Sequence, residues 1–120
     1  MTDLSQHERV ERMAVNGNRK GKAGERELAK VLREAGYEAR RSQQYCGVEG
    51  DGDLKHEIPG LHIECKRVER LNVLKAYEQA ATEAGFKTPC VMHRCNRGPW
   101  LVSLSLTDFL ALLRVGDGLD

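Results

Sequence analysis

The sequence predicts a single-domain α/β fold, and three observations carry that prediction. The chain has 120 residues, which is long enough for one compact core and too short for two. Helical and strand-like apolar patterns follow one another in the order α, β, β, β, α, β, β, α. Charged residues make up 31% and hydrophobic residues 40%, without an apolar run long enough for a bilayer. We therefore expect a globular protein and exclude a membrane protein.

The N-terminus is the one part of the chain that looks separable. We expect residues 1–16 to form an arm or a loosely attached helix, and residues 17–120 to form the folded domain. The arm lacks the basic start and apolar centre of a secretory signal, so a cytoplasmic location is expected. The four cysteines, Cys46, Cys65, Cys90 and Cys95, have no framework spacing and fit reduced thiols in that compartment.

The first half of the domain predicts one helix and three strands. Good helix formers with apolar residues at helical spacing predict a helix over residues 21–35, which Gly36 ends. Residues 37–42 read as a strand, and a glycine-rich loop follows. The segments "DLKHE" and "LHIECKRV" predict the next two strands. Pro59 and Gly60 between them suit the tight turn of a hairpin.

The second half predicts a helix, two strands and a last helix. Asn72 can cap a helix that runs to about Ala84. The segments "TPCVMHRC" and "WLVSLSL" read as strands, with "NRGP" as the turn between them. A short helix, "DFLALLRV", then begins at Ser105 or Thr107 and is closed by Gly116.

Cysteine and histidine in "CVMHRC" invite a zinc-site interpretation, since both residue types bind zinc. On a strand, however, Cys90 and Cys95 point to opposite faces, and only His93 and Cys95 share one. The pattern therefore favours a structural role.

Glu25 is the first residue whose position is unusual. Residues 25, 28, 29 and 32 form one helical ridge, and the last three are the apolar side that must face the sheet. A carboxylate on a buried stripe is costly unless a cation or a metal compensates its charge. The alternative is that Glu25 only favours the positive end of the helix dipole.

An aspartate and a Glu-x-Lys pair on the predicted strands complete a set of polar residues that begins with Glu25. Asp53 begins a strand after "GDG", with Asp51 as its rival, and either can be a turn aspartate that bonds to its local backbone. Glu64 and Lys66 point to the same face of the next strand, which His62 shares. Such a pair also occurs on ordinary exposed strands, and a bland role for the histidine is open as well.

Taken together, three acids and an amine indicate metal-assisted chemistry. Carboxylate oxygens suit magnesium, which keeps waters and a substrate phosphate among its ligands. Such a metal lowers the pKa of a bound water and neutralises charge on a phosphodiester. Lys66 would orient that water or stabilise the transition state. Phosphodiester hydrolysis fits Glu25, Asp53, Glu64 and Lys66.

The stretches "KGKAGERELAKVLREAGYEARR", "GDGDL", "HIECK" and "YEQA" resemble the PD-(D/E)xK, or restriction-endonuclease-like, nucleases. Within that family the chain is most similar to the archaeal and phage Holliday-junction resolvases. The resemblance implies a mixed β-sheet core flanked by helices. It also implies Mg²⁺, for which Mn²⁺ can substitute, held by Glu25, Asp53, Glu64 and the backbone carbonyl of Cys65. Lys66 would serve the nucleophile, and Gln79 would support the site.

The resemblance further implies a homodimer that cuts four-way or other branched DNA in two strands. The net charge is only +1, but basic residues bunch where elements begin or end. The bunched residues expected to meet phosphates are Arg19, Lys20, Lys22, Arg40, Arg41 and Arg67. Two departures from the family pattern are Gly52 in place of the proline before the aspartate, and "YCG" in place of a Ser-Gly, where Tyr45 can replace the hydroxyl.

Two alternatives to a junction resolvase share this fold, and the sequence does not exclude them. One is a general repair or restriction nuclease that acts on DNA ends or flaps. The other is a DNA-binding module that does not cut.

Overall fold

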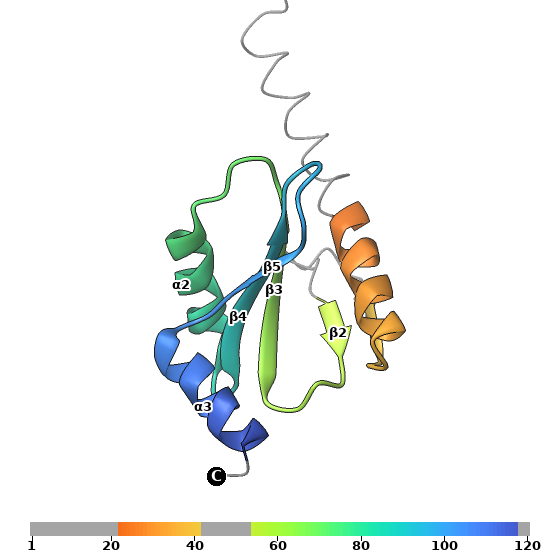
Figure 1. The fold of residues 1–120 in the computed structure, drawn as a ribbon. Coiled ribbons are helices and arrows are strands. Elements are labelled where there is room, and N and C mark those ends of the chain that lie inside the picture. The colour runs from red at the N-terminus through yellow and green to blue at the C-terminus, as the bar shows by residue number, and fades with distance from the viewer. Residues whose placement is uncertain (1–21, 42–53, 118–120) are drawn as a thin grey trace, which may run out of the picture.

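The structure is a computed structural model that describes residues 22–41 and 54–117, and these form an α/β fold. The elements occur in the predicted order. They are a helix over residues 22–34, β1 (Ala39–Arg41), β2 (Leu54–His56), β3 (Leu61–Arg67), α2 (Val73–Ala84), β4 (Thr88–Arg94), β5 (Leu101–Ser103) and α3 (Leu106–Gly116). The 22–34 helix lies on one side of β3 and β4, and α2 lies on the other (Figure 1). The expected arm, residues 1–16, lies outside the described residues.

The strands of the described ranges form two small sheets. β3 and β4 are parallel, as the intervening α2 crossover requires, and β5 pairs antiparallel with β4. This gives a mixed sheet in the order β3-β4-β5. β1 and β2 form a separate antiparallel pair. The α/β class and the mixed sheet are therefore confirmed.

The expected hairpin of β2 with β3 is wrong for the described part of the chain. β2 makes its ladder with β1, and the pairing is extended by the Glu57 amide, which donates to the Glu38 carbonyl at 3.0 Å. The turn at Pro59 and Gly60 does form, with a φ of 70° at the glycine. The Gly60 carbonyl, however, accepts from the Thr88 amide at 2.8 Å, which extends the pairing of β3 with β4.

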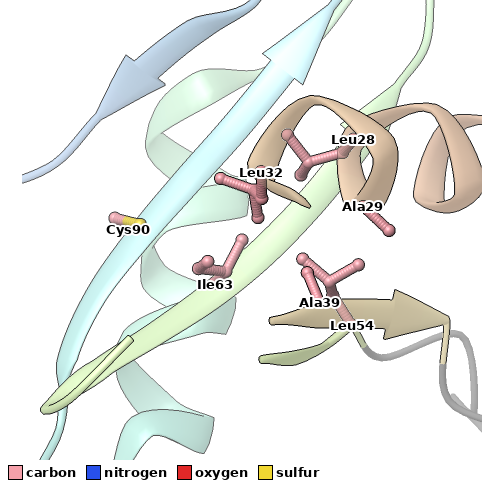
Figure 2. Close-up of a cluster of buried hydrophobic side chains, with 7 residues drawn as sticks. All are labelled: Leu28, Ala29, Leu32, Ala39, Leu54, Ile63 and Cys90. Atoms are coloured by element: carbon pink, nitrogen blue, oxygen red, sulfur yellow. The ribbon is translucent and has the colours of Figure 1, made fainter. Parts of the chain in front are cut away.

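The core has two layers, one on each face of the β3-β4 pair. Figure 2 shows the larger cluster, in which apolar side chains of the 22–34 helix meet β1, β2, β3 and β4. Its buried members are Leu28, Ala29, Leu32, Ala39, Leu54, Ile63 and Cys90. The second cluster lies under α2 and consists of Ala76, Ala80 and Val91. The helix stripe predicted at positions 28, 29 and 32 is therefore the one that is buried.

Local signals explain where α2 and α3 begin. The Asn72 side chain accepts from the Lys75 amide at 3.0 Å, and the Ser105 side chain accepts from the Asp108 amide at 3.1 Å. Each bond satisfies one amide that the first helical turn leaves open. Asn72 was expected to cap α2, and Ser105 was one of two candidates for α3.

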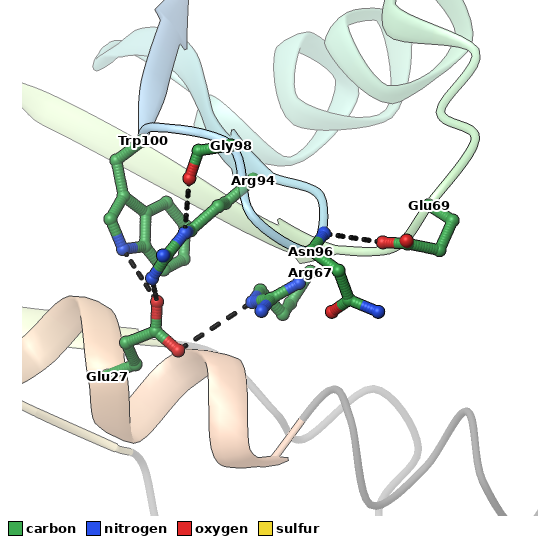
Figure 3. Close-up of polar contacts among 7 residues, drawn as sticks. All are labelled: Glu27, Arg67, Glu69, Arg94, Asn96, Gly98 and Trp100. Atoms are coloured by element: carbon green, nitrogen blue, oxygen red, sulfur yellow. Dashed lines mark hydrogen bonds and ion pairs between the residues drawn. The ribbon is translucent and has the colours of Figure 1, made fainter.

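A polar cluster attaches the 22–34 helix to the carboxyl ends of β3 and β4. Figure 3 shows the Glu27 carboxylate with three cationic or donor groups around it. Arg94 donates to Glu27, the Trp100 indole donates to it at 3.0 Å, and Nε of Arg67 lies 3.6 Å from it. A half-buried carboxylate with several partners orients the helix on the sheet.

At Gly24 the 22–34 helix packs closely against Arg67 of β3. A Cβ at this position would lie 2.9 Å from Cγ of Arg67, and closer still to its Cβ. Gly24→Ala is therefore expected to lower the free energy of unfolding by about 1–3 kcal/mol, because the helix must move away. Gly116 of α3 has open space around it. Gly116→Ala is the matched control and should be neutral or stabilising by up to about 1 kcal/mol.

Urea denaturation of both variants at one protein concentration measures the difference. Equal stability of Gly24→Ala and the parent would contradict this close packing.

α3 stands apart from both core layers. None of its residues is buried, and its apolar side chains Leu106, Phe109, Leu110 and Leu113 are between 46% and 70% exposed. Within the described ranges, no helix is both long enough and apolar enough to cross a membrane. The apolar face of α3 is therefore surface of the single chain.

Candidate functional site

Side chains alternate along β3 between two different layers. Ile63 is in register with Cys90, and both belong to the core under the 22–34 helix. Glu64 is in register with Val91, which packs against α2. Partners in register on neighbouring strands face the same side of a sheet. The alternation expected for this strand is confirmed, and Glu64 lies on the α2 side.

Glu64 and Lys66 come together on that face. The Glu64 residue is only 9% exposed, and the Nζ of Lys66 lies 3.5 Å from its Oε1. Withdrawing a carboxylate from water is unfavourable unless positive charge or hydrogen bonds compensate it. The amine supplies part of that compensation. The pair predicted from the Glu-x-Lys spacing is thus a direct contact.

Glu25 is buried as expected, and its partner is a residue of β1. The glutamate is 5% exposed, and Nε of Arg41 donates to its Oε1 at 3.3 Å. The side chain of Arg41 is itself 25% exposed. The buried charge required a cation, and the structure supplies a guanidinium. The role of Arg41 toward phosphates stays a prediction, and this ion pair competes with it.

The pKa of the Cys65 thiol is raised by burial and by both buried glutamates. Burial, together with the nearby carboxylates of Glu25, Glu64 and Glu27, raises the pKa of this thiol to about 12. Cys65 packs on the core side of β3 together with the 22–34 helix. Glu25 and Glu64 therefore act on one thiol from the two sides of the strand. A thiol with this pKa stays protonated at neutral pH and is no nucleophile. The role of its carbonyl as a metal ligand stays a prediction.

Two more side chains gather around Glu64 on the α2 face. Nε2 of His62 lies 4.0 Å from Oε2 of Glu64 and 3.8 Å from Oε2 of Glu83. One ligand-type atom from each of the three residues lies within 4.8 Å of the others. Glu83 belongs to α2 and is half exposed. It lies four residues after Gln79, which is also exposed, so both share one ridge of the helix.

Sequence reasoning missed Glu83 and left His62 with a bland role. A local signal did exist for the glutamate. It follows Gln79 by one helical turn and sits between the buried positions Ala80 and Ala84. That spacing places it at the border of the buried stripe. Its meeting with a strand residue, however, depends on how α2 docks.

A divalent cation fits the α2 side of β3 better than it fits the surroundings of Glu25. On the α2 side, two carboxylates and one imidazole supply oxygen and nitrogen ligands from His62, Glu64 and Glu83. Glu25 already has the Arg41 guanidinium as a counter-charge. Asp53, Asp51, Tyr45 and Cys46 lie outside the described residues, so the structure describes only part of the predicted ligand set.

The basic residues expected at DNA differ in exposure. Lys22 and Arg40 are exposed, and Arg40 borders an open groove of about 650 Å³ on β1 and β2 that Arg33 and Lys55 also line. The Arg67 side chain is only 14% exposed and faces Glu27. Arg19 and Lys20 lie outside the described residues. Arg40 is therefore better placed for a phosphate than Arg67.

The two potential zinc ligands on β4 have other surroundings. Cys90 is buried in the core, and Nε2 of His93 lies 2.8 Å from the Ser103 hydroxyl. Cys65, Cys90 and Cys95 are free thiols, as expected. The structural role predicted for "CVMHRC" accords with these contacts.

Comparisons with protein-family models, with curated proteins and with solved structures give no match for this chain.

Proposed function

We propose that this protein is a metal-dependent DNA endonuclease with a restriction-endonuclease-like fold, which cuts branched DNA such as four-way junctions. The observation that carries the proposal is the contact of a buried Glu64 with Lys66 at 3.5 Å on β3. The element order, which matches the one that the family resemblance implies, also supports it. Glu25 stays a proposed ligand, although its buried carboxylate is paired with Arg41 in the structure.

The chemistry follows from the positions of these side chains. A bound divalent cation, Mg²⁺ or Mn²⁺, would neutralise charge on the phosphodiester and acidify a water. Glu64 has the charge and burial to hold such a cation beside the scissile phosphate. The Lys66 ammonium, 29% exposed, can reach a phosphate oxygen or the attacking water from the same face. Gln79 and Asp53 keep their proposed supporting and ligand roles.

Phosphate contacts are proposed for exposed cations of the 22–34 helix and of β1. Lys22 at the start of the 22–34 helix and Arg40 beside the β1-β2 groove are exposed. Lysine and arginine that neutralise phosphates release counterions, so binding should weaken steeply with salt.

We also propose that two copies assemble through α3 and β5, since symmetric cutting needs two active sites. Leu106, Phe109, Leu110 and Leu113 of α3 follow helical spacing and are all at least 46% exposed. Leu101 and Val102 of β5 are 52% and 56% exposed. Exposed apolar surface of this kind, on α3 above all, is typical of an interaction site.

The proposed activity is tested by cleavage of a labelled four-way junction beside linear duplex, flap and single-stranded DNA. Each substrate is incubated with Mg²⁺, with Mn²⁺ and with chelator. The expected result is metal-dependent, paired cutting of the junction. Equal cutting of linear duplex or flaps would support the nuclease activity but contradict the preference for junctions. Binding without cutting of any substrate would favour the non-catalytic module.

A further inference from the structure

The three-residue group on the α2 face has a feature that the proposed function does not use. Nε2 of His62 is buried, and among the residues that the structure describes it has no hydrogen-bond partner. Leaving a buried polar atom without a partner costs about 1–3 kcal/mol. The two nearest acidic oxygens, those of Glu64 and Glu83, lie 4.0 Å and 3.8 Å away.

These separations are too long for hydrogen bonds and suitable for a shared ion. An N–H···O bond spans about 2.7–3.2 Å. Metal–nitrogen and metal–oxygen bonds of about 2.0–2.2 Å place two ligands of one ion up to about 4.2 Å apart. Both distances from His62 Nε2, 4.0 Å and 3.8 Å, fall inside that limit, but the three ligand atoms together lie within 4.8 Å, so a bound ion requires one carboxylate to move inward. Glu83 is half exposed and can adjust its rotamer, whereas Glu64 is fixed by burial.

We propose that His62, Glu64 and Glu83 form a binding site for a divalent transition-metal ion between β3 and α2. The mixed set of one imidazole and two carboxylates decides the class of ion. Magnesium prefers an all-oxygen set, whereas imidazole suits zinc, iron and nickel, and manganese accepts an imidazole beside carboxylates. The site shares Glu64 with the proposed catalytic group, but metal binding here does not require nuclease activity.

Metal binding is measured on the full chain without DNA. Mn²⁺ is the probe, because it accepts carboxylate and imidazole and has little preference for the exposed thiol of Cys95. Isothermal titration should show one site that binds Mn²⁺ more tightly than Mg²⁺. His62→Gln and Glu83→Gln should each weaken binding by about 10- to 100-fold or more. The matched control Glu78→Gln, an exposed acid on the same helix, should leave it unchanged.

Pulsed electron paramagnetic resonance on the unaltered protein gives a readout that no folding defect can mimic. A ¹⁴N coupling to bound Mn²⁺ is expected, and it should disappear in His62→Gln. Absence of this coupling in the unaltered chain, or Mn²⁺ affinity that survives both His62→Gln and Glu83→Gln, would overturn the site.

One further variant separates this inference from the proposed nuclease. Glu25→Gln removes a ligand of the set implied by the family resemblance and none of the ligands proposed here. Loss of Mn²⁺ affinity in Glu25→Gln with retention in Glu83→Gln would assign the ion to that other set and overturn this one. Retained Mn²⁺ binding in a chain that cuts no DNA would support the site while the nuclease proposal fails.

Discussion

Lys66→Ala is expected to lower the rate of junction cleavage by about 10²- to 10³-fold while DNA binding is largely kept. A loss of this size is typical when an enzyme loses one preorganised donor that stabilises the negative charge of the transition state. Lys66 lies 3.5 Å from Glu64, so its ammonium is held on the face where the phosphodiester is expected. The measurement is single-turnover cleavage with saturating protein, which separates chemistry from binding.

The matched control is Lys75→Ala, which removes another lysine from an exposed position on α2. Its cleavage rate should equal that of the parent. Fluorescence anisotropy with an uncleaved junction shows whether binding is retained in both variants. If Lys66→Ala cuts at the parental rate, the Glu64–Lys66 pair is a structural ion pair and the proposed active site is wrong.

Leu110→Glu is expected to abolish the proposed dimer and leave a monomer. Leu110 is 49% exposed on α3, and with Leu106, Phe109 and Leu113 it forms an apolar stripe that no other described residue buries. A carboxylate in the centre of a buried interface leaves an uncompensated charge, which costs several kcal/mol. Light scattering coupled to size-exclusion chromatography, over a range of protein concentrations, measures the change in mass.

Ala111→Glu adds the same charge to an exposed position beside the stripe and should preserve the dimer. A parent protein that is monomeric at all concentrations would contradict the assembly through α3. In the proposed dimer each subunit carries one active site. The monomeric Leu110→Glu variant should therefore cut the two strands of a junction independently, so that singly nicked junctions accumulate.

Local patterns predicted the elements because their causes lie within a few residues. The 22–34 helix buries Glu25, Leu28, Ala29 and Leu32, which is the ridge that helical spacing selects. Asn72 caps α2 through its own side chain. Strand alternation likewise placed Glu64 and Lys66 on one face, and they are in contact.

Pairings between distant segments could not be predicted in the same way. A tight turn at Pro59 and Gly60 suggested that β2 and β3 form a hairpin, yet β2 pairs with β1. The turn residues fix only the local chain reversal. Which strand completes the ladder depends on packing of the whole core, in which Leu54 of β2 and Ile63 of β3 belong to one buried cluster although the two strands form no ladder with each other.

The same contrast between local patterns and distant packing applies to the partners of the buried charges. From the sequence, a carboxylate at position 25 on an apolar stripe required a cation, but only the docking of β1 beside the helix identified Arg41. The sequence determined the α/β class, the element order and the Glu-x-Lys pair, because periodicity and capping act over one or two turns. Only the tertiary structure brought Glu83 to His62 and set Glu25 and Glu64 on two sides of β3, because those contacts arise from helices packing on opposite faces of one strand.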